Sequence, residues 1–333
     1  MSTLSVQNPT LLDFANELGP DGKTIRDVAE VLELKNEILT DMTVTEGNET
    51  TGHSFLMRTG TATPTWMKIN GYINATKNTS IPVTQTCGRL SSLLEVDPEL
   101  ADRGGNRERF LRNQDVGSMG GMADEMAATL FSGNESTKPE SFTGFGPYYN
   151  LSTGNENSSH VLKHDEAATT NSDIWLIGWS PTTVHGFFPN GSKGGLQFED
   201  MGIQLVSNAT GGRAKRIVHT WDWRLGLALE DWRYVARAHF GLTLAAGYLT
   251  GSANTSMIDM MIEMEDLMPS KSDVRLVYYL SQNGLTMLRK QIKKDMTGNL
   301  SYETVGGRPV TMFNGIPCVR TDAILNNQSA LTA

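Results

Sequence analysis

The segment His219–Phe240 has the sequence HTWDWRLGLALEDWRYVARAHF. Bulky apolar residues alternate with polar or small ones along much of it, which is the period-two pattern of a β-strand. If the chain turns back at Glu230-Asp231, the segment forms a long hairpin in which large residues mostly oppose small ones on one face. The predicted facing pairs on this apolar face are Trp221–Phe240, Trp223–Ala238, Leu225–Ala236, Leu227–Tyr234 and Leu229–Trp232.

The opposite face of the predicted hairpin carries basic side chains. Arg224 would lie directly across from Arg237, with Arg233 further along the same face. Two arginines in facing positions repel each other unless acidic groups lie against them. We therefore expect Arg224, Arg233 and Arg237 to contact acidic groups of the same or a neighbouring subunit. A change of Arg237 to Glu should then impair assembly more than folding, so the pattern favours an assembly protein over an enzyme.

Composition indicates a loop-rich protein of one large domain or two ordinary ones. The chain has 333 residues, of which 38% are hydrophobic and 33 are Gly. This supplies a core, but much of the chain must run as loops, arms and hairpins. The net charge is −9, and no block of Lys and Arg is present, which argues against a protein that grips nucleic acid.

The sequence gives no sign of export or of membrane insertion. The first residues lack a basic region followed by a long apolar run, as a signal peptide would have. No segment approaches the roughly 18 consecutive apolar residues that a membrane span needs. Cys87 and Cys318 lie far apart in the sequence and are expected to be reduced structural thiols.

The first part of the chain is expected to form an arm followed by an extended ribbon. Thr24–Thr40 has helical spacing of apolar residues, and three strands are predicted to follow it. These strands are His53–Thr59, Trp66–Ile73 and Ile81–Cys87. Long polar turns separate them, so the ribbon should project from the body. Its residues Trp66, Met67 and Tyr72 would then need cover from another molecule.

The longest predicted helix is Asn106–Phe131. It carries a stripe of apolar residues at i, i+3 and i+4 spacing. Gly117, Gly120 and Gly121 each cost up to about 1 kcal/mol inside a helix. They indicate a place where another backbone passes close to the helix or where the helix bends.

The rest of the chain mixes strands and helices without a regular βαβ alternation, which predicts an α+β class. Asn314-Gly315 is the strongest hairpin signal in the sequence. The other expected elements are a buried strand at Asp173–Trp179, a helix at Met257–Met268 with Thr255 as N-cap, a strand at Val274–Leu280, a helix at Asn283–Lys294 and a terminal strand pair at Pro309–Phe313 and Ile316–Arg320.

No motif in the sequence calls for catalysis, and we expect no catalytic residue, no cofactor and no metal. A nucleophile elbow, a Walker loop and a dinucleotide-binding glycine pattern are all missing from the sequence. His160 and His164 stand four residues apart with Asp165 next to them, a spacing that could hold a metal on a helix. Their surroundings have the composition of a polar loop. A metal-dependent hydrolase is therefore only a minor alternative.

Several stretches resemble the Hong Kong 97-type capsid proteins of tailed bacteriophages, in the branch of podoviruses like phage epsilon-fifteen. Their succession, more than any single motif, carries the resemblance. The stretches are FLMRTGTATPTWMKINGY (Phe55–Tyr72), CGRLSSLLEVDPELA (Cys87–Ala101), ATLFSGN (Ala128–Asn134), ESFTGFGPYYN (Glu140–Asn150), GFFPNGSKGGLQFEDMG (Gly186–Gly202), WRLGLALEDWRYVARAHF (Trp223–Phe240) and FNGIPCVRTDAIL (Phe313–Leu325).

The resemblance implies a division of the chain into five parts. Residues 1–45 would be an N-terminal arm, and 46–90 an extended loop (E-loop) that lies across the adjacent subunit. Residues 91–150 would form a peripheral domain with the long spine helix. The axial domain would take residues 151–300, and the strands of 301–333 would return to the peripheral domain.

The resemblance also implies the function of a major capsid protein. Copies of the chain would assemble into pentamers and hexamers of an icosahedral virion shell, enclosing double-stranded DNA without sequence-specific binding. The implied partners are further copies, portal and scaffolding proteins and a cement or decoration protein, with synthesis in the bacterial host cytoplasm and no membrane contact. An encapsulin-type nanocompartment, built on the same fold, is the alternative from a different functional class.

Overall fold

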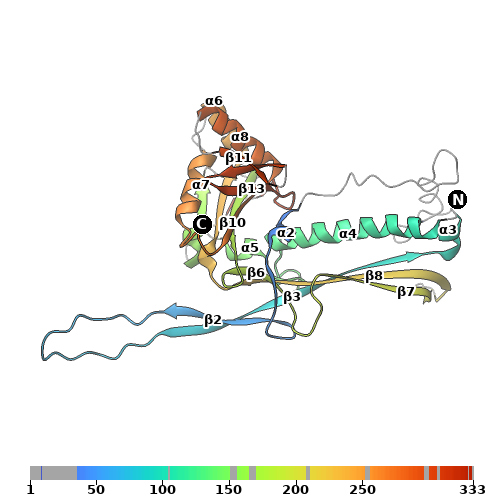
Figure 1. Cartoon of the computed structure of the whole chain (residues 1–333), viewed down its shortest axis with the longest axis horizontal. Helices are drawn as coiled ribbons and strands as arrows, with labels where there is room; N and C mark the ends of the chain where they lie inside the picture. The colour runs from blue at the N-terminus through green and yellow to red at the C-terminus, as the bar shows by residue number, and fades with distance from the viewer. Residues whose placement is uncertain are drawn as a thin grey trace.

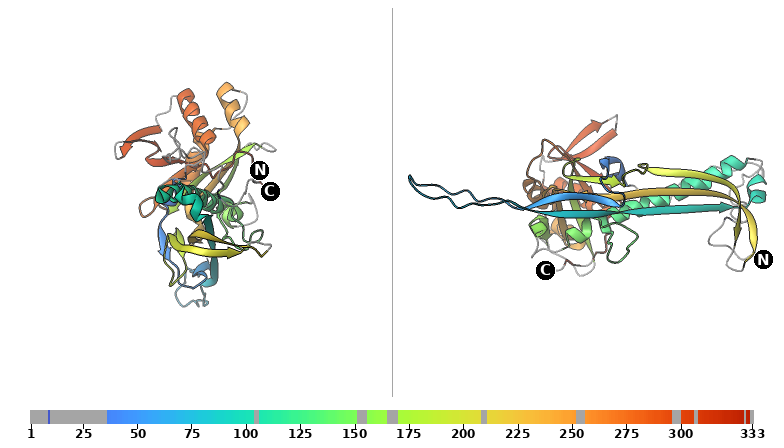
Figure 2. Two further views of the ribbon diagram at one scale, coloured as in Figure 1. Left: turned by 90° about the vertical axis from the view of Figure 1, so that its right-hand side faces the viewer. Right: turned by 90° about the horizontal axis from the view of Figure 1, so that it is seen from below.

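The computed structural model describes residues 9, 36–103, 106–150, 156–164, 170–207, 211–251, 256–295, 300–305, 308–328 and 330–331. Figure 1 shows a compact body from which two long features extend. On one side the helix α4 (Arg107–Ser132) runs beside long strands, and on the other the hairpin formed by β2 (Gly52–Gly60) and β3 (Thr79–Val96) projects away from the body. The extended shape is equally clear when the molecule is seen from below (Figure 2).

The body is built on a sheet whose central strand, β5 (Asn171–Trp179), is buried along its whole length. This confirms the buried strand expected at Asp173–Trp179. The body strands, in the order in which they pair, are β11 (Leu300–Val305), β12 (Arg308–Phe313), β13 (Ile316–Arg320), β10 (Arg275–Leu280), β5, β9 (Val235–Gly241) and β4 (Val161–His164).

Alternate side chains of β5 enter two separate cores, as the period of a strand requires. Ile174 and Leu176 pack in the core shared with α7 and α8. Trp175 and Ile177 belong to the core that holds the C-terminal end of α4. The helices of the body are α6 (Leu242–Thr250), α7 (Met257–Asp266), α8 (Gln282–Asp295) and the short α5 (Phe145–Tyr148).

The expected helices and turns of the body are largely confirmed. α8 and α7 lie where helical spacing of apolar residues placed them, although the N-cap of α7 is Ser256 instead of Thr255. Asn314 and Gly315 have φ angles of 48° and 81° and join β12 to β13, as an Asn-Gly turn predicts. α6 was not predicted, since its sequence lacks a polar face.

The long helix α4 confirms the helix expected at Asn106–Phe131. Asn106 caps its first turn by accepting a hydrogen bond from the backbone N–H of Arg109, and α3 (Pro98–Asp102) precedes it. Its C-terminal half buries Met122, Met126 and Leu130. At Gly117, Gly120 and Gly121 an added Cβ would meet nothing within 4 Å, so the glycines themselves are not required by a close approach of the described residues.

Two further long strands lie on the α4 side. β8 (Arg213–Leu229) pairs with β3 from Ile217 to Gly226, and β7 (Leu196–Ser207) pairs with the other edge of β8. The end of β8 also pairs with β6 (Val184–Phe188), which itself carries the short parallel strand β1 (Val44–Glu46). These contacts join the long strands to the body.

The hairpin predicted for His219–Phe240 is wrong, because β8 and β9 pair with different strands. The backbone N–H groups of Glu230 and Asp231 both donate to the carbonyl of Thr183, at 2.9 and 3.2 Å, which brings the end of β8 against β6. Asp231 then caps the short 3-10 helix η2 (Trp232–Tyr234), which directs β9 to β5. The last five residues of β8 and all of β9 are buried, so both faces of these segments are covered. The alternation of large and small residues therefore did not identify a single buried face.

The ribbon after residue 46 is one hairpin, with no third strand. β2 and the first half of β3 pair antiparallel, and together they contain the expected strands His53–Thr59 and Ile81–Cys87. The strand predicted at Trp66–Ile73 is wrong. Those residues belong to the long tip loop 61–78, which reverses at a turn where the N–H of Gly71 donates to the carbonyl of Lys68 and Asn70 has a φ of 64°.

The helix expected at Thr24–Thr40 lies mostly outside the described residues. Its end is described as α2 (Ile38–Asp41), whose Ile38 is buried in the core of the body. Asn36 forms an isolated bridge with Thr321, so this segment lies against the last part of the chain. The two cysteines are free, as expected, and burial raises the pKa of the Cys318 thiol to about 12.

Candidate functional site

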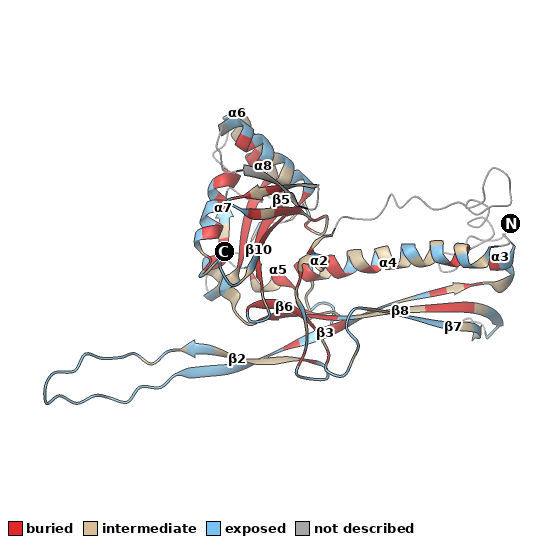
Figure 3. Cartoon of the chain, viewed as in Figure 1, coloured by how far each residue is buried: buried red, intermediate tan, exposed pale blue. Residues whose placement is uncertain are grey.

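The tip of the β2–β3 hairpin exposes several large apolar side chains. Trp66 and Tyr72 are fully exposed, at 104% and 102%, and Met67 is 59% exposed. Ile69, at 95%, adds a fourth large side chain that the sequence analysis did not single out. Figure 3 shows that the projecting end of the hairpin is exposed on both of its strands. Apolar groups gathered in this way usually mark a surface that binds another macromolecule.

Arg237, one of the three arginines singled out in the sequence, is buried inside the body. Its guanidinium donates to Asp173 Oδ2 at 2.8 Å, to Gln328 Oε1 at 2.8 Å and to the carbonyl of Tyr149 at 2.9 Å. It also lies 5.1 Å from the centre of the Trp175 ring. Arg237 therefore meets an acidic group of its own subunit, which is one of the two expected outcomes. Because it is buried there, it is not available as a contact between subunits.

Asp173 is the centre of this buried network. Its second oxygen lies 2.6 Å from His239 Nδ1, and neither side chain is more than 2% exposed. Burial raises the pKa of the Asp173 carboxyl, but Arg237 and His239 lower it by more, so the net pKa is below its usual value. The network therefore holds a charged carboxylate in the core and fixes β9 to β5.

The other two arginines lie apart from Arg237 and from each other. Arg233 is paired with Asp231 of its own turn, at 2.8 Å, in an exposed position. Arg224 is exposed and lies opposite Arg89 in the β3–β8 register, while Asp222 accepts two hydrogen bonds from Arg89. Hydrogen bonds from Arg89, and more weakly the charge of Arg224, lower the pKa of Asp222, so Arg224 also has this carboxylate nearby. The single cationic face predicted for the three arginines does not exist.

A groove between α4 and the β7–β8 pair contains a second group that the sequence analysis missed. Asp115 of α4 lies 2.9 Å from His219 Nδ1 and accepts from Trp221 Nε1 at 3.3 Å. Phe198 of β7 stacks against Trp221 with 4.5 Å between ring centres. The cavity here measures about 380 Å³ and is lined by apolar and acidic side chains of α4, β7 and β8.

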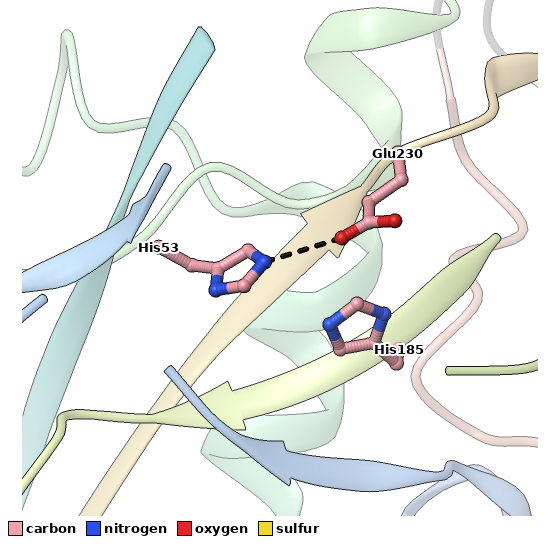
Figure 4. A group of neighbouring side chains, drawn as sticks. All are labelled: His53, His185 and Glu230. Carbon is pink, nitrogen blue, oxygen red and sulfur yellow. Dashed lines mark hydrogen bonds and ion pairs between the residues drawn. The ribbon is translucent and has the colours of Figure 1, made fainter. Parts of the chain in front are cut away.

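His53, His185 and Glu230 form a third group, at the base of the projecting hairpin. They come from β2, from β6 and from the residue after β8. His53 Nε2 lies 3.2 Å from Glu230 Oε1, and the rings of the two histidines are 5.5 Å apart (Figure 4). Burial lowers the pKa of His185. No sequence pattern indicated this group, because its members are widely separated along the chain.

The alternative metal pair of the sequence analysis is not assembled. His160 is buried, with Nδ1 3.1 Å from the carbonyl of Val235 and its ring against Trp232. His164 lies at the end of β4, 3.3 Å from Glu263. His160 ends the 3-10 helix η1 (Glu156–His160) and is followed by a strand, so the i, i+4 spacing does not place the two rings on one helical face. Asp165 lies outside the described residues.

The sequence matches the protein family described as major capsid protein GP7 over residues 19–332. No match is found among curated proteins. No helix in the described part of the chain is long and apolar enough to cross a membrane.

A solved structure of bacteriophage Epsilon15 matches with a TM-score of 0.78 and 26% identity, and the match covers 100% of both chains. This confirms the expected α+β capsid fold. The capsid of bacteriophage JBD30 matches with a TM-score of 0.49 and 10% identity, over 88% of this chain and 93% of that one. The SrpI encapsulin of Synechococcus elongatus matches with a TM-score of 0.43 and 10% identity, over 65% of this chain and 90% of that one. This TM-score is too low to support the nanocompartment alternative.

Proposed function

Because the chain belongs to the major capsid protein GP7 family and is a structural subunit of a bacteriophage head, we propose that its copies interlock through the projecting β2–β3 hairpin. In this proposal the hairpin is the E-loop, and it lies across an adjacent subunit. Pentamers and hexamers joined in this way tile an icosahedral shell around double-stranded DNA. The observation that carries the proposal is the complete exposure of Trp66 and Tyr72 on a hairpin that extends beyond its own body.

Simple energetics favours this role for the tip. Burying one large apolar side chain contributes on the order of 2 kcal/mol, so the tip residues Trp66, Ile69 and Tyr72 gain substantially from cover. Many such contacts act together in a closed shell, because each subunit already held in place raises the effective concentration for the next contact. Weak single contacts therefore suffice for a stable particle.

The five-part division of the chain carries over to this proposal with one change. Residues 1–45 serve as the N-terminal arm, 46–90 as the E-loop, 91–150 as the peripheral domain with α4 as spine, and 151–300 as the axial domain, with 301–333 as the returning strands. The paired strands β7 and β8 lie along β3 and α4, so we assign Leu196–Leu229 to the peripheral domain. β3 itself continues across residue 90, which makes the E-loop an extension of the peripheral domain.

The remaining aspects of the role follow from the nature of a shell wall. The protein acts structurally and catalyses no reaction. The net charge of −9 suits a wall that encloses DNA without gripping it. Portal, scaffolding and cement proteins are its further partners, and the chain is made in the host cytoplasm before it enters the virion.

The test is a double substitution at the tip, Trp66→Ser with Tyr72→Ser, examined by electron microscopy of the assembled product. We expect the variant to lose most of its particles, while circular dichroism of the unassembled chain stays unchanged. Thr76→Ser, a polar change on the same exposed tip, is the matched control and should assemble normally. A normal particle yield from the double variant would refute the role given to the hairpin.

A further inference from the structure

The group at the base of the hairpin has the composition of a metal site. His53, His185 and Glu230 each offer a ligand atom, and these atoms all lie within 4.8 Å of one another. Among the residues that the structure describes, this is the one group of three or more such side chains found. Two imidazoles and a carboxylate are the ligand types that zinc and related divalent cations take in proteins.

The distances suit a small divalent cation. Zinc binds histidine nitrogen and carboxylate oxygen at about 2.0–2.2 Å, so two ligand atoms of a tetrahedral site lie roughly 3.3–3.4 Å apart. His53 Nε2 and Glu230 Oε1 are already 3.2 Å apart. The ligand atom of His185 lies within 4.8 Å of both of these atoms.

The state of His185 is the second, independent observation. Its side chain is buried, with the residue only 2% exposed, and its Nδ1 has no hydrogen-bond partner. Figure 4 shows the His185 ring beside the His53–Glu230 pair, with one ring nitrogen on the side towards His53. A buried polar nitrogen without a partner is costly, and a cation bound at this edge would satisfy it.

The surroundings leave room for access and for a fourth ligand. The Glu230 side chain is 29% exposed, and that of His53 is 14% exposed, so the carboxylate side of the group opens towards solvent. A water molecule on that side would complete a four-coordinate site. The carboxylate would also neutralise part of the charge of a divalent cation.

We propose that His53, His185 and Glu230 bind a zinc-class divalent cation that fastens the base of the β2–β3 hairpin to β6 and to the end of β8. The three ligands come from the three strands that meet where the hairpin leaves the body. A cation at this point fixes the direction in which the hairpin extends. The site departs from the sequence-based expectation of no metal, and it does not depend on the role of the hairpin tip.

The test measures zinc on the full-length protein. The chain is treated with EDTA, dialysed, and titrated with Zn²⁺ against a chromophoric chelator, and the bound metal is then quantified by elemental analysis. We expect stoichiometric zinc on the unchanged protein and at least a tenfold loss of affinity in His185→Gln and in Glu230→Gln, since even indirect supports of a metal site cost about 10–100-fold. His164→Gln is the control outside the group and should bind as the unchanged protein does.

A second readout separates a metal site from a simple ion pair. Zn²⁺ should raise the thermal unfolding temperature of the unchanged protein and slow proteolysis in the hairpin, but do neither in Glu230→Gln. Glu230 is partly exposed, so this variant keeps its fold even where His185→Gln does not. Substoichiometric zinc on the unchanged protein, or equal zinc affinity in Glu230→Gln, would overturn the proposal.

Discussion

The sheet of the body and the β2–β3 hairpin differ in where their apolar side chains find cover. Every residue of β5 is buried by other parts of the same chain. Trp66 and Tyr72 at the hairpin tip are covered by nothing in the described part of that chain. The described part of the body therefore covers its own apolar side chains, whereas the tip of the hairpin leaves large apolar side chains exposed. The comparison indicates that folding and assembly depend on different parts of this protein.

α4 belongs to both regions. Its C-terminal end packs Met126, Leu130 and Phe131 into the core of the body. Further towards its N-terminus, Gly117 and Gly121 are exposed, with open space beside them. One helix thus joins the core of the body to a surface that the described part of the chain leaves open.

The largest expected effect comes from a charge reversal in the body. Arg237→Glu removes the buried partner of Asp173 and sets a second carboxylate beside it, so we expect a loss of about 3–5 kcal/mol in the free energy of unfolding. Denaturant unfolding of the unassembled chain measures it. This replaces the expectation that the variant would impair assembly more than folding.

Arg233→Glu is the control for that reversal. Arg233 is exposed and is paired with Asp231, and exposed ion pairs contribute about 0–1 kcal/mol. Similar losses in the two variants would break the contrast between the buried body and its surface.

Lowering the pH should reduce the free energy of unfolding by a smaller amount, because buried titratable groups of the body change their protonation. Burial lowers the pKa of His160 in the folded chain. As the pH falls below about 6.5, the unfolded chain therefore takes up a proton at this residue before the folded chain does. The free energy of unfolding should decline from there. A further decline follows at lower pH, because Asp173 has a lowered pKa and stabilises the fold only while it is ionised.

Unfolding measured over a series of pH values, with His160→Gln alongside, checks this order. The glutamine variant should show a smaller decline near neutral pH than the unchanged protein, because burial also lowers the pKa of His185, which still contributes. It should keep the acidic decline. If stability stayed constant from pH 7 to pH 5 in the unchanged protein, neutral burial of His160 would be the wrong explanation.

The smallest effect is expected on the open side of α4. Gly120→Ala should raise the free energy of unfolding by about 0.4–1 kcal/mol, because alanine reduces the conformational freedom of the unfolded chain and its methyl group meets nothing within 4 Å. Thermal unfolding of the unassembled chain measures the gain. A loss of stability would mean that α4 departs from helical geometry at Gly120.

Local patterns predicted much of the fold. The helical stripe of residues 106–131, the apolar run at 173–179 and the Asn314-Gly315 turn all gave elements that the structure confirms. The exposed Trp66, Met67 and Tyr72 were also expected to be uncovered by their own chain. Each of these features depends on neighbours within a few residues, or on the composition of the surrounding turn.

Partners distant in sequence were predicted poorly. The alternation in His219–Phe240 identified two strands, but it paired them with each other, whereas β8 pairs with β3, β6 and β7, and β9 pairs with β4 and β5. Alternation shows that a strand has two faces. It does not show which strand lies beside it, and a single capped turn at Asp231 was enough to redirect the chain.

The sequence by itself determined the α+β class, the long helix, the projecting ribbon and the resemblance that led to a capsid protein. Only the tertiary structure decided that Arg237 is an internal partner of Asp173 and that His53, His185 and Glu230 meet at the base of the hairpin. The physical reason is separation along the chain. Helices and turns are specified by nearby residues, whereas buried ion pairs and ligand groups arise only when distant segments pack together.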